Sequence, residues 1–203
     1  MDRIITIGRQ FGAGGREIGK AVAARLNIPY YDKELLVVAA KESGLDTRFL
    51  ENYDERTNSL LYSLVMGQAG RFYGGHQYDT VETLAARAQR EALLSVARNG
   101  PCVIVGRCAD EILRQAGIDS LNVFVYADQL HRAVYASELT GITNATELQK
   151  LLKRVDSGRQ VYYNHYTGKK WGDPHNYHMS LDSGTLGYDL CAKFIVEAIQ
   201  AAD

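Results

Sequence analysis

Glycines and arginines gather near the start of the chain in a pattern that suits anion binding. Residues 8–17 read Gly-Arg-Gln-Phe-Gly-Ala-Gly-Gly-Arg-Glu and separate an apolar run at 4–7 from a run with helical apolar spacing at 18–26. A buried strand that feeds glycines into a helix start points several backbone N–H groups at one place, where the helix dipole adds partial positive charge. This glycine loop therefore predicts a phosphate site.

The glycine loop departs from the standard phosphate-binding sequence Gly-x4-Gly-Lys-Ser/Thr. When the two are aligned through Gly12-Ala13-Gly14, the lysine position holds Gly15 and the leading glycine position holds Arg9. Arg16 and Glu17 occupy the next two positions, where a Mg2+-binding hydroxyl is expected. A strand-to-helix turn that needs glycines only for their positive φ is the alternative interpretation.

A dinucleotide-binding loop is a weaker interpretation of the same residues. Its Gly-x-Gly-x-x-Gly sequence fails at Glu17. Asp32 lies at a plausible distance along the chain for a ribose contact, but only a very short apolar segment precedes it.

Two further polar positions follow predicted strands. Asp32 follows Tyr30-Tyr31, and Gly106-Arg107 follows the continuous apolar run at 102–105. Because ligands of parallel α/β sheets bind at the carboxyl ends of strands, we expect the glycine loop, Asp32 and Arg107 to converge on one edge. The planar guanidinium of Arg107 suits a carboxylate or a phosphate, and a structural salt bridge is the alternative.

A second group of basic residues lies later in the chain. Arg159 follows Asp156 by three residues, which places both on one helical face. A mobile basic helix closing over phosphates would supply transition-state charge and exclude water, and a solvated helix face is the alternative. We prefer the solvated face for Lys150 and Lys153. The whole group consists of Lys150, Lys153, Arg154, Arg159, Lys169 and Lys170.

The elements that must position these residues alternate between strand and helix. This alternation predicts an α/β fold with a parallel sheet and helices on both faces. Strands are expected at 4–7, 30–32, 102–105, 121–126 and 178–182, and helices at 33–43, 79–98, 111–116, 129–140, 144–163 and 187–202, with a loop from 162 to 177.

Composition narrows the class of protein. The 203 residues with 46% apolar content suit one domain, and the net charge of −1 with a pI near 6.5 gives no basic stripe for nucleic acid. No segment approaches the roughly 18 apolar residues of a membrane span, and the chain enters its first strand too early for a signal peptide. Three cysteines, an odd number, favour a reducing cytoplasm. We expect Cys102, Cys108 and Cys191 to be core thiols rather than metal ligands.

Along nearly its whole length the sequence resembles the cytidylate kinase-like proteins, within the P-loop nucleoside-monophosphate kinases. The first strand, the glycine loop and the Asp156-x-x-Arg159 pair of the lid helix match. The segment from Tyr162 through Trp171-Gly172-Asp173-Pro174 to Tyr177 is typical of the kinase-like branch, and residues 54–78 match least. Three strand ends match as well, namely Tyr30-Tyr31-Asp32, Val105-Gly106-Arg107 and Phe124-Val125-Tyr126-Ala127.

The resemblance implies a single kinase-like domain in three parts. These are a core at 1–32, 101–130 and 176–203, a monophosphate-binding insertion at about 33–100, and a lid at about 131–175. ATP would bind with Mg2+ at the glycine loop, through Gly12, Ala13, Gly14, Gly15, Arg16 and Glu17, and the resemblance does not identify the Mg2+ ligands.

The same resemblance implies roles for individual side chains. Arg16 would replace the missing lysine, and the lid would carry Arg159 onto the phosphates with Asp156 beside it. Asp32 and Arg107 would face the acceptor nucleotide. Arg132, at the start of the lid, would add charge there.

Three functions follow as hypotheses. The first is a phosphotransferase that moves the γ-phosphate of ATP to a nucleoside monophosphate, with CMP as one candidate. The second is a kinase of another small metabolite. The third is a nucleotide- or phosphate-binding regulatory protein without transfer activity, which the missing lysine favours and Arg107 opposes. All three have small-molecule partners, with no nucleic acid or membrane, and the oligomeric state does not follow from the sequence.

Overall fold

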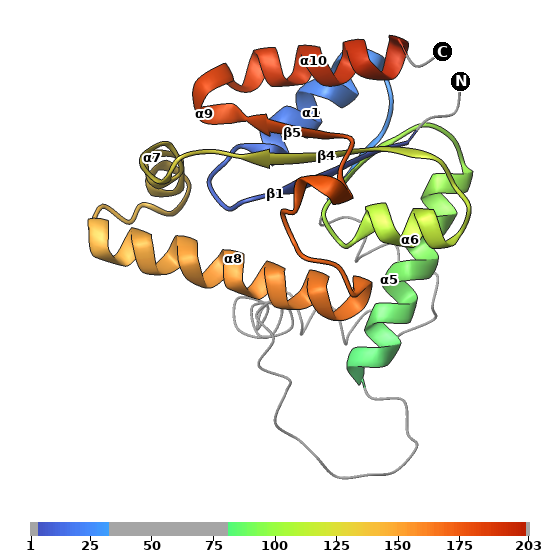
Figure 1. Ribbon diagram of the computed structural model, residues 1–203, viewed down its shortest axis with the longest axis horizontal. Coiled ribbons are helices and arrows are strands. Elements are labelled where there is room, and N and C mark those ends of the chain that lie inside the picture. The colour runs from blue at the N-terminus through green and yellow to red at the C-terminus, as the bar shows by residue number, and fades with distance from the viewer. Residues whose placement is uncertain (1–3, 33–80, 202–203) are drawn as a thin grey trace.

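The computed structural model describes residues 4–32 and 81–201, with side chains for 4–32 and 89–201. Most of the expected insertion, including the helix predicted at 33–43, lies outside these residues. The described strands form one parallel sheet in the order β2-β3-β1-β4-β5 (Figure 1). They are β1 (Ile4–Arg9), β2 (Tyr30–Tyr31), β3 (Val103–Val105), β4 (Ser120–Tyr126) and β5 (Met179–Asp182).

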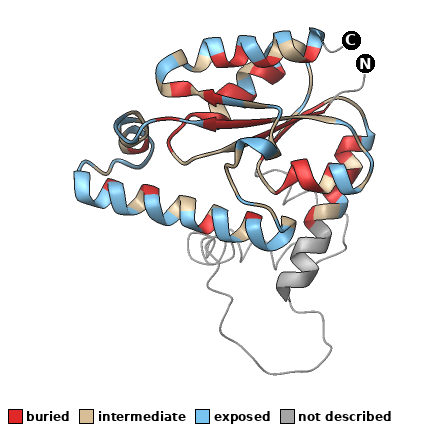
Figure 2. Ribbon diagram, viewed as in Figure 1, coloured by how far each residue is buried: buried red, intermediate tan, exposed pale blue. Residues whose placement is uncertain are grey.

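Helices cover both faces of this sheet (Figure 1). Side chains alternate along β1, so Ile5 and Ile7 join one buried cluster while Ile4 joins the other. The first cluster includes residues of α1 (Gly15–Leu26) and α10 (Tyr188–Ala201), and the second includes residues of α5 (Val81–Arg98) and α6 (Ala109–Gln115). The predicted α/β class is confirmed, and Figure 2 shows the buried residues concentrated along the sheet and the helix faces against it.

Two long helices follow β4 and carry the predicted lid residues. α7 (Gln129–Thr140) begins where the Asp128 carboxylate accepts hydrogen bonds from two backbone N–H groups, and Asn144 caps α8 (Ala145–Thr167) in the same way through one. Figure 1 shows α8 on the opposite side of the sheet from α1 and α10.

Near the C-terminus the structure corrects two sequence-based expectations. α8 continues to Thr167, because Tyr163 is buried and donates a hydrogen bond to Asp110, and Gly168 with φ 68° then ends the helix. The predicted loop therefore starts later, and it contains a 3-10 turn at Pro174–Asn176. A short helix not predicted from the sequence, α9 (Ser183–Leu186), precedes α10.

The three cysteines are buried and free, as expected for core thiols. Burial raises the pKa of Cys102 to about 11, so this thiol stays protonated at neutral pH. None of the helices within 4–32 and 81–201 combines the length and apolar character that crossing a bilayer requires.

Candidate functional site

The glycine loop leads from β1 into α1 and leaves the start of that helix open. Gly12 and Gly14 have φ values of 83° and 69°, and Gly14 is the N-cap residue without a side-chain hydrogen bond. Within the described residues, no group accepts a hydrogen bond from the N–H of Gly14, Gly15 or Arg16. Open N–H groups at the positive end of a helix dipole suit an anion.

Other N–H groups of the loop are bonded within the protein. The N–H of Phe11 donates to Asp156 Oδ1 at 2.8 Å, and the N–H of Ala13 approaches the Gln10 carbonyl at 3.4 Å. The part of the loop that is open to a ligand is therefore its end, where α1 begins.

Close neighbours explain three of the loop glycines. A Cβ on Gly12 would collide with the backbone carbonyl of Arg132, and one on Gly14 would collide with the ring of Tyr188. A Cβ on Gly15 would lie 2.6 Å from Cβ of Arg9. The loop is thus enclosed by α7, by α10 and by the end of its own strand.

Two arginines pair with one carboxylate at this edge of the sheet, and two more lie near enough to interact electrostatically with this group. Arg16 Nε lies 2.5 Å from Asp32 Oδ2, and Arg9 Nη2 lies 3.7 Å from Oδ1 of the same carboxylate. The Asp32 side chain is 8% exposed, so these charges meet in a poorly solvated place. We call Arg9, Arg16, Arg107 and Arg159, together with Asp32, the arginine cluster.

Mutual repulsion within the arginine cluster shows in the pKa values of its members. Burial lowers the pKa of Arg9 to about 10, with further lowering by Arg107 and Arg16 and an opposing effect of Asp32. Burial and the charge of Arg9 hold the pKa of Arg159 well below its ordinary value. A phosphate bound here would neutralise charge that the protein leaves in excess.

Arg107 is presented by an unusual turn between β3 and α6. Gly106, Arg107 and Cys108 have consecutive φ values of 82°, 62° and 52°, a left-handed conformation that costs energy at the two residues with a side chain. No carboxylate of the described residues forms an ion pair with Arg107. The structural salt bridge considered for this arginine therefore has no partner among the side chains of 4–32 and 89–201.

One residue of α7 and one of α8 bind the glycine loop from outside. Arg132 donates from Nε to the Phe11 carbonyl at 2.9 Å and from Nη2 to Asp156 Oδ2 at 2.6 Å. Asp156 thus binds Arg132 with one oxygen and the Phe11 N–H with the other. Burial raises the pKa of Asp156, and these two hydrogen bonds act against that shift. This carboxylate joins the loop to α7 and α8.

Arg159 reaches the loop from the same helix. Its Nη1 donates to the Arg9 carbonyl at 2.9 Å, and its guanidinium carbon lies 5.7 Å from the centre of the Phe11 ring. Phe11 in turn packs against the apolar residues that join α7 to α8, namely Ala136, Leu148 and Leu152. Helices α7 and α8 and the loop therefore form one packed unit.

The predicted site residues fall into two groups. Arg16, Asp32 and Arg159 belong to the arginine cluster, and Arg107 lies near enough to Arg9 for its charge to lower the pKa of Arg9. The others lie elsewhere: Asp156 and Arg132 bind each other, Glu17 pairs with Lys20 at 3.5 Å, Lys169 pairs with Glu111 at 2.8 Å, and Lys150 and Lys153 are exposed.

Sequence reasoning did not place Arg9 or Phe11 in the site. The signal for Arg9 is its position, since a basic residue replaces the leading glycine of the phosphate-loop sequence. Phe11 carries no comparable signal, because its role depends on apolar residues more than 120 positions later, as its cluster with Ala136, Leu148 and Leu152 shows.

A parallel sheet, a glycine loop between its first strand and a helix, and cations at the same edge together define the architecture of a P-loop kinase. The family model of the cytidylate kinase-like family matches residues 4–185. The chain belongs to the cytidylate kinase-like family.

Solved structures agree with this fold. An uncharacterised protein from Eubacterium ventriosum is similar at 26% identity and a TM-score of 0.72, with 98% of this chain and 99% of that chain covered. A shikimate kinase from Bacteroides thetaiotaomicron shares the fold at 17% identity and a TM-score of 0.54, with 100% of this chain and 98% of that chain covered. The Thermus thermophilus protein TT1252 shares the fold at 14% identity and a TM-score of 0.55, with 99% of this chain and 97% of that chain covered. No curated protein matches the chain significantly. Family and fold support phosphoryl transfer to a nucleotide or another small metabolite.

Proposed function

We propose that this protein moves the γ-phosphate of ATP to a nucleoside monophosphate, with CMP as the first acceptor to test. The observation that carries the proposal is the arginine cluster, which lies between the open start of α1 and the turn that presents Arg107. The donor phosphates would bind the N–H groups of Gly14 to Arg16. The acceptor phosphate would bind Arg107, whose planar guanidinium can hold two oxygens at once.

Phosphoryl transfer requires mainly positioning and neutralisation of charge. The acceptor is already a phosphate oxyanion, so no residue has to remove a proton from it. Arg159 would neutralise charge on the transferred group from the lid side, where it already contacts the Arg9 carbonyl. Asp32 would orient Arg16, and Asp156 with Arg132 would keep the lid against the loop.

Magnesium would enter this site as the MgATP complex. Within the described residues, no three His, Cys, Asp or Glu side chains come together as a metal site. Mg2+ needs only one or two carboxylates when phosphate oxygens and water supply the remaining ligands. Asp32, the carboxylate of the arginine cluster, is 2.5 Å from Arg16 and would hold that arginine rather than the metal.

Two other functions stay in competition. A kinase of another small metabolite uses the same fold in the shikimate kinase described above. A nucleotide-binding regulatory protein is favoured by Gly15, which stands where a transferring loop has its lysine, and by Arg16 and Glu17, which follow it where the Mg2+-binding hydroxyl is expected.

A coupled assay with ATP, Mg2+ and separate acceptors distinguishes the three functions. Turnover with CMP or another nucleoside monophosphate is the expected result. Turnover with a non-nucleotide alcohol alone selects the metabolite kinase. Nucleotide binding in a calorimeter, unaffected by Mg2+ and without turnover of any acceptor, selects the regulatory protein and ends the kinase proposal.

A further inference from the structure

The side chain of Arg9 crosses the start of α1 and ends beside the turn between β3 and α6. An ideal Cβ on Gly15 would lie 2.6 Å from Cβ of Arg9 and 2.9 Å from its Cγ. At the far end, a Cβ on Gly106 would collide with Arg9 Nη1. Arg9 therefore fills the space over two glycines, and its guanidinium lies next to the turn that presents Arg107.

The close approach at Gly15 is one that no rotamer change relieves. Cβ of Arg9 is fixed by the backbone at the end of β1, and a Cβ at position 15 is fixed by the first residue of α1. A separation of 2.6 Å is far below the carbon–carbon contact distance of about 3.5–4.0 Å. On this backbone, a side chain fits at position 9 or at position 15, but not at both.

This exclusion accounts for two departures from the standard loop together. The standard sequence has glycine at the position of Arg9 and lysine at the position of Gly15. Here the two are exchanged, so a cation enters from the strand end and the glycine stands at the helix start. The exchange keeps one positive charge at the loop while changing the backbone position that carries it.

We infer that Arg9 supplies to the donor phosphates the positive charge that the loop lysine supplies in standard phosphate loops. The inference rests on the proposed function, because it assumes that phosphates bind at the start of α1. Arg9 suits this role better than Arg16, since its side chain is 16% exposed rather than 39%. Arg16 is also held by Asp32 at 2.5 Å, whereas Arg9 lies 3.7 Å from that carboxylate.

A cycle of four proteins tests the inference: the wild type, Arg9→Gly, Gly15→Lys, and the double variant Arg9→Gly/Gly15→Lys. The double variant rebuilds the standard loop in this chain. For each protein we measure the Kd of a non-hydrolysable ATP analogue by titration calorimetry and the Tm without ligand. Neither measurement depends on transfer activity.

The expected results follow from the steric exclusion. Arg9→Gly weakens analogue binding by about 10- to 100-fold, as expected for the loss of a charge-assisted contact. Gly15→Lys lowers the Tm, because its side chain meets Arg9. The double variant binds at least ten times more tightly than Arg9→Gly and has a higher Tm than Gly15→Lys.

Rescue by the double variant separates this role from a merely structural one. If Arg9 served only to compensate the charge of Asp32, a lysine at position 15 would not restore binding. Wild-type affinity in Arg9→Gly, or a double variant no better than the single variants, overturns the inference.

Arg9→Met keeps the test decisive where Gly15→Lys fails to fold. Methionine retains an unbranched chain across Gly15 without the charge, so we expect weak binding at a nearly unchanged Tm, and wild-type affinity overturns the inference.

Arg25→Met is the matched control, since Arg25 is exposed in the last turn of α1 and pairs with Asp189. The wild type can bind the analogue through Arg9 and still show no turnover with any acceptor. That result ends the proposed function and leaves this inference standing.

Discussion

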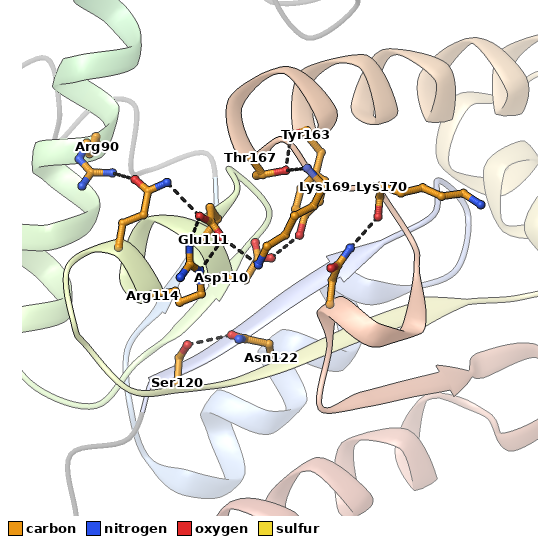
Figure 3. A network of polar contacts seen from close by, with 12 residues as sticks. Arg90, Asp110, Glu111, Arg114, Ser120, Asn122, Tyr163, Thr167, Lys169 and Lys170 are labelled. Carbon is orange, nitrogen blue, oxygen red and sulfur yellow. Dashed lines mark hydrogen bonds and ion pairs between the residues drawn. The ribbon is translucent and has the colours of Figure 1, made fainter.

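Two polar regions of this protein balance their charges in opposite ways. The first is the arginine cluster, which contains four guanidinium groups and one carboxylate, that of Asp32. The second, which we call the acidic network, joins Asp110 and Glu111 of α6 to Tyr163 and Lys169 at the end of α8 (Figure 3). Glu111 accepts hydrogen bonds from Arg114 at 2.9 and 2.6 Å and from Gln115 at 2.9 Å, and it pairs with Lys169 at 2.8 Å.

The difference supports the proposal that the arginine cluster, rather than the acidic network, binds a ligand. In the acidic network each carboxylate meets donors from the protein itself, so the network fastens α6 to α8 without an external partner. In the arginine cluster, burial and mutual repulsion lower the pKa of Arg9 and of Arg159, which is a cost to folding. Perturbed groups of this kind gather at functional sites, where a substrate supplies the missing charge.

The largest effect is expected at Arg159. Arg159→Met should lower kcat by about 10³-fold, because a guanidinium that neutralises the transferred phosphoryl group contributes on that scale. Steady-state kinetics with saturating ATP and acceptor measure the loss. Lys150→Met, on an exposed face of the same helix, is the charge-matched control and should leave kcat unchanged. Equal kcat values for the two variants would remove Arg159 from the reaction.

Arg107 should separate binding from stability. Both Arg107→Ala and Arg107→Gly should raise the acceptor KM by about 10- to 100-fold through the lost charge-assisted contact. Because residue 107 has a φ of 62°, glycine should be more stable there than alanine by about 1 kcal/mol in urea unfolding. An unchanged KM in both variants would return Arg107 to a purely structural role.

Glu111 tests the acidic network and its dependence on pH. Glu111→Gln should lower the free energy of unfolding at pH 7 by about 2 kcal/mol and leave the acceptor KM unchanged. Hydrogen bonds from Arg114, foremost, hold the pKa of Glu111 at about 2, below its ordinary 4.5.

The sign of the pH dependence follows from that depressed pKa. The stabilisation by Glu111 is fully present above about pH 4.5 and is lost as the pH falls toward about 2. The difference between Glu111→Gln and the wild type should therefore shrink over this range in urea unfolding series. Glu197→Gln, an exposed change on α10, is the control. A difference that stays constant down to pH 2 would contradict the ionic role of Glu111.

The smallest effect is expected from an inorganic anion. Pyrophosphate at ten times its Kd should stabilise the wild type by about 1.4 kcal/mol, which raises the Tm by about 3–5 °C in a domain of this size. Glu111→Gln should keep this shift, and Arg159→Met should lose most of it. An equal shift in both variants, measured by calorimetric melting, would place the anion outside the arginine cluster.

Much of the sheet was predictable because its local signals agree. A continuous apolar run predicted β3, as expected for a parallel strand covered on both faces, and largely apolar runs that contain Thr6 and Asn122 predicted β1 and β4. The end of α8 was not predictable in this way. Tyr163 looks like part of a polar, aromatic loop until its hydroxyl is seen to bind Asp110, which lies 53 positions earlier.

The candidate site also has a part that was predictable from the sequence and a part that was not. Parallel-sheet topology places Asp32 and Arg107 at one edge with the glycine loop, so their convergence followed from the order of strands alone. The partners of Asp156 did not follow, because its position beside Arg159 says nothing about which atoms its two oxygens reach. In the structure these are the Phe11 N–H and Arg132.

By itself, the sequence determined the α/β class, the glycine loop between the first strand and a helix, and the residue types available to an anion. Apolar periodicity and glycine placement are local properties, so they can be recognised from neighbouring residues without knowing which distant residues are in contact. Only the tertiary structure explains why an arginine at position 9 goes with a glycine at position 15, because a Cβ at position 15 would lie 2.6 Å from Cβ of Arg9. Two carbon atoms cannot share that space, and only the folded backbone brings the end of β1 and the start of α1 close enough to make the exclusion act.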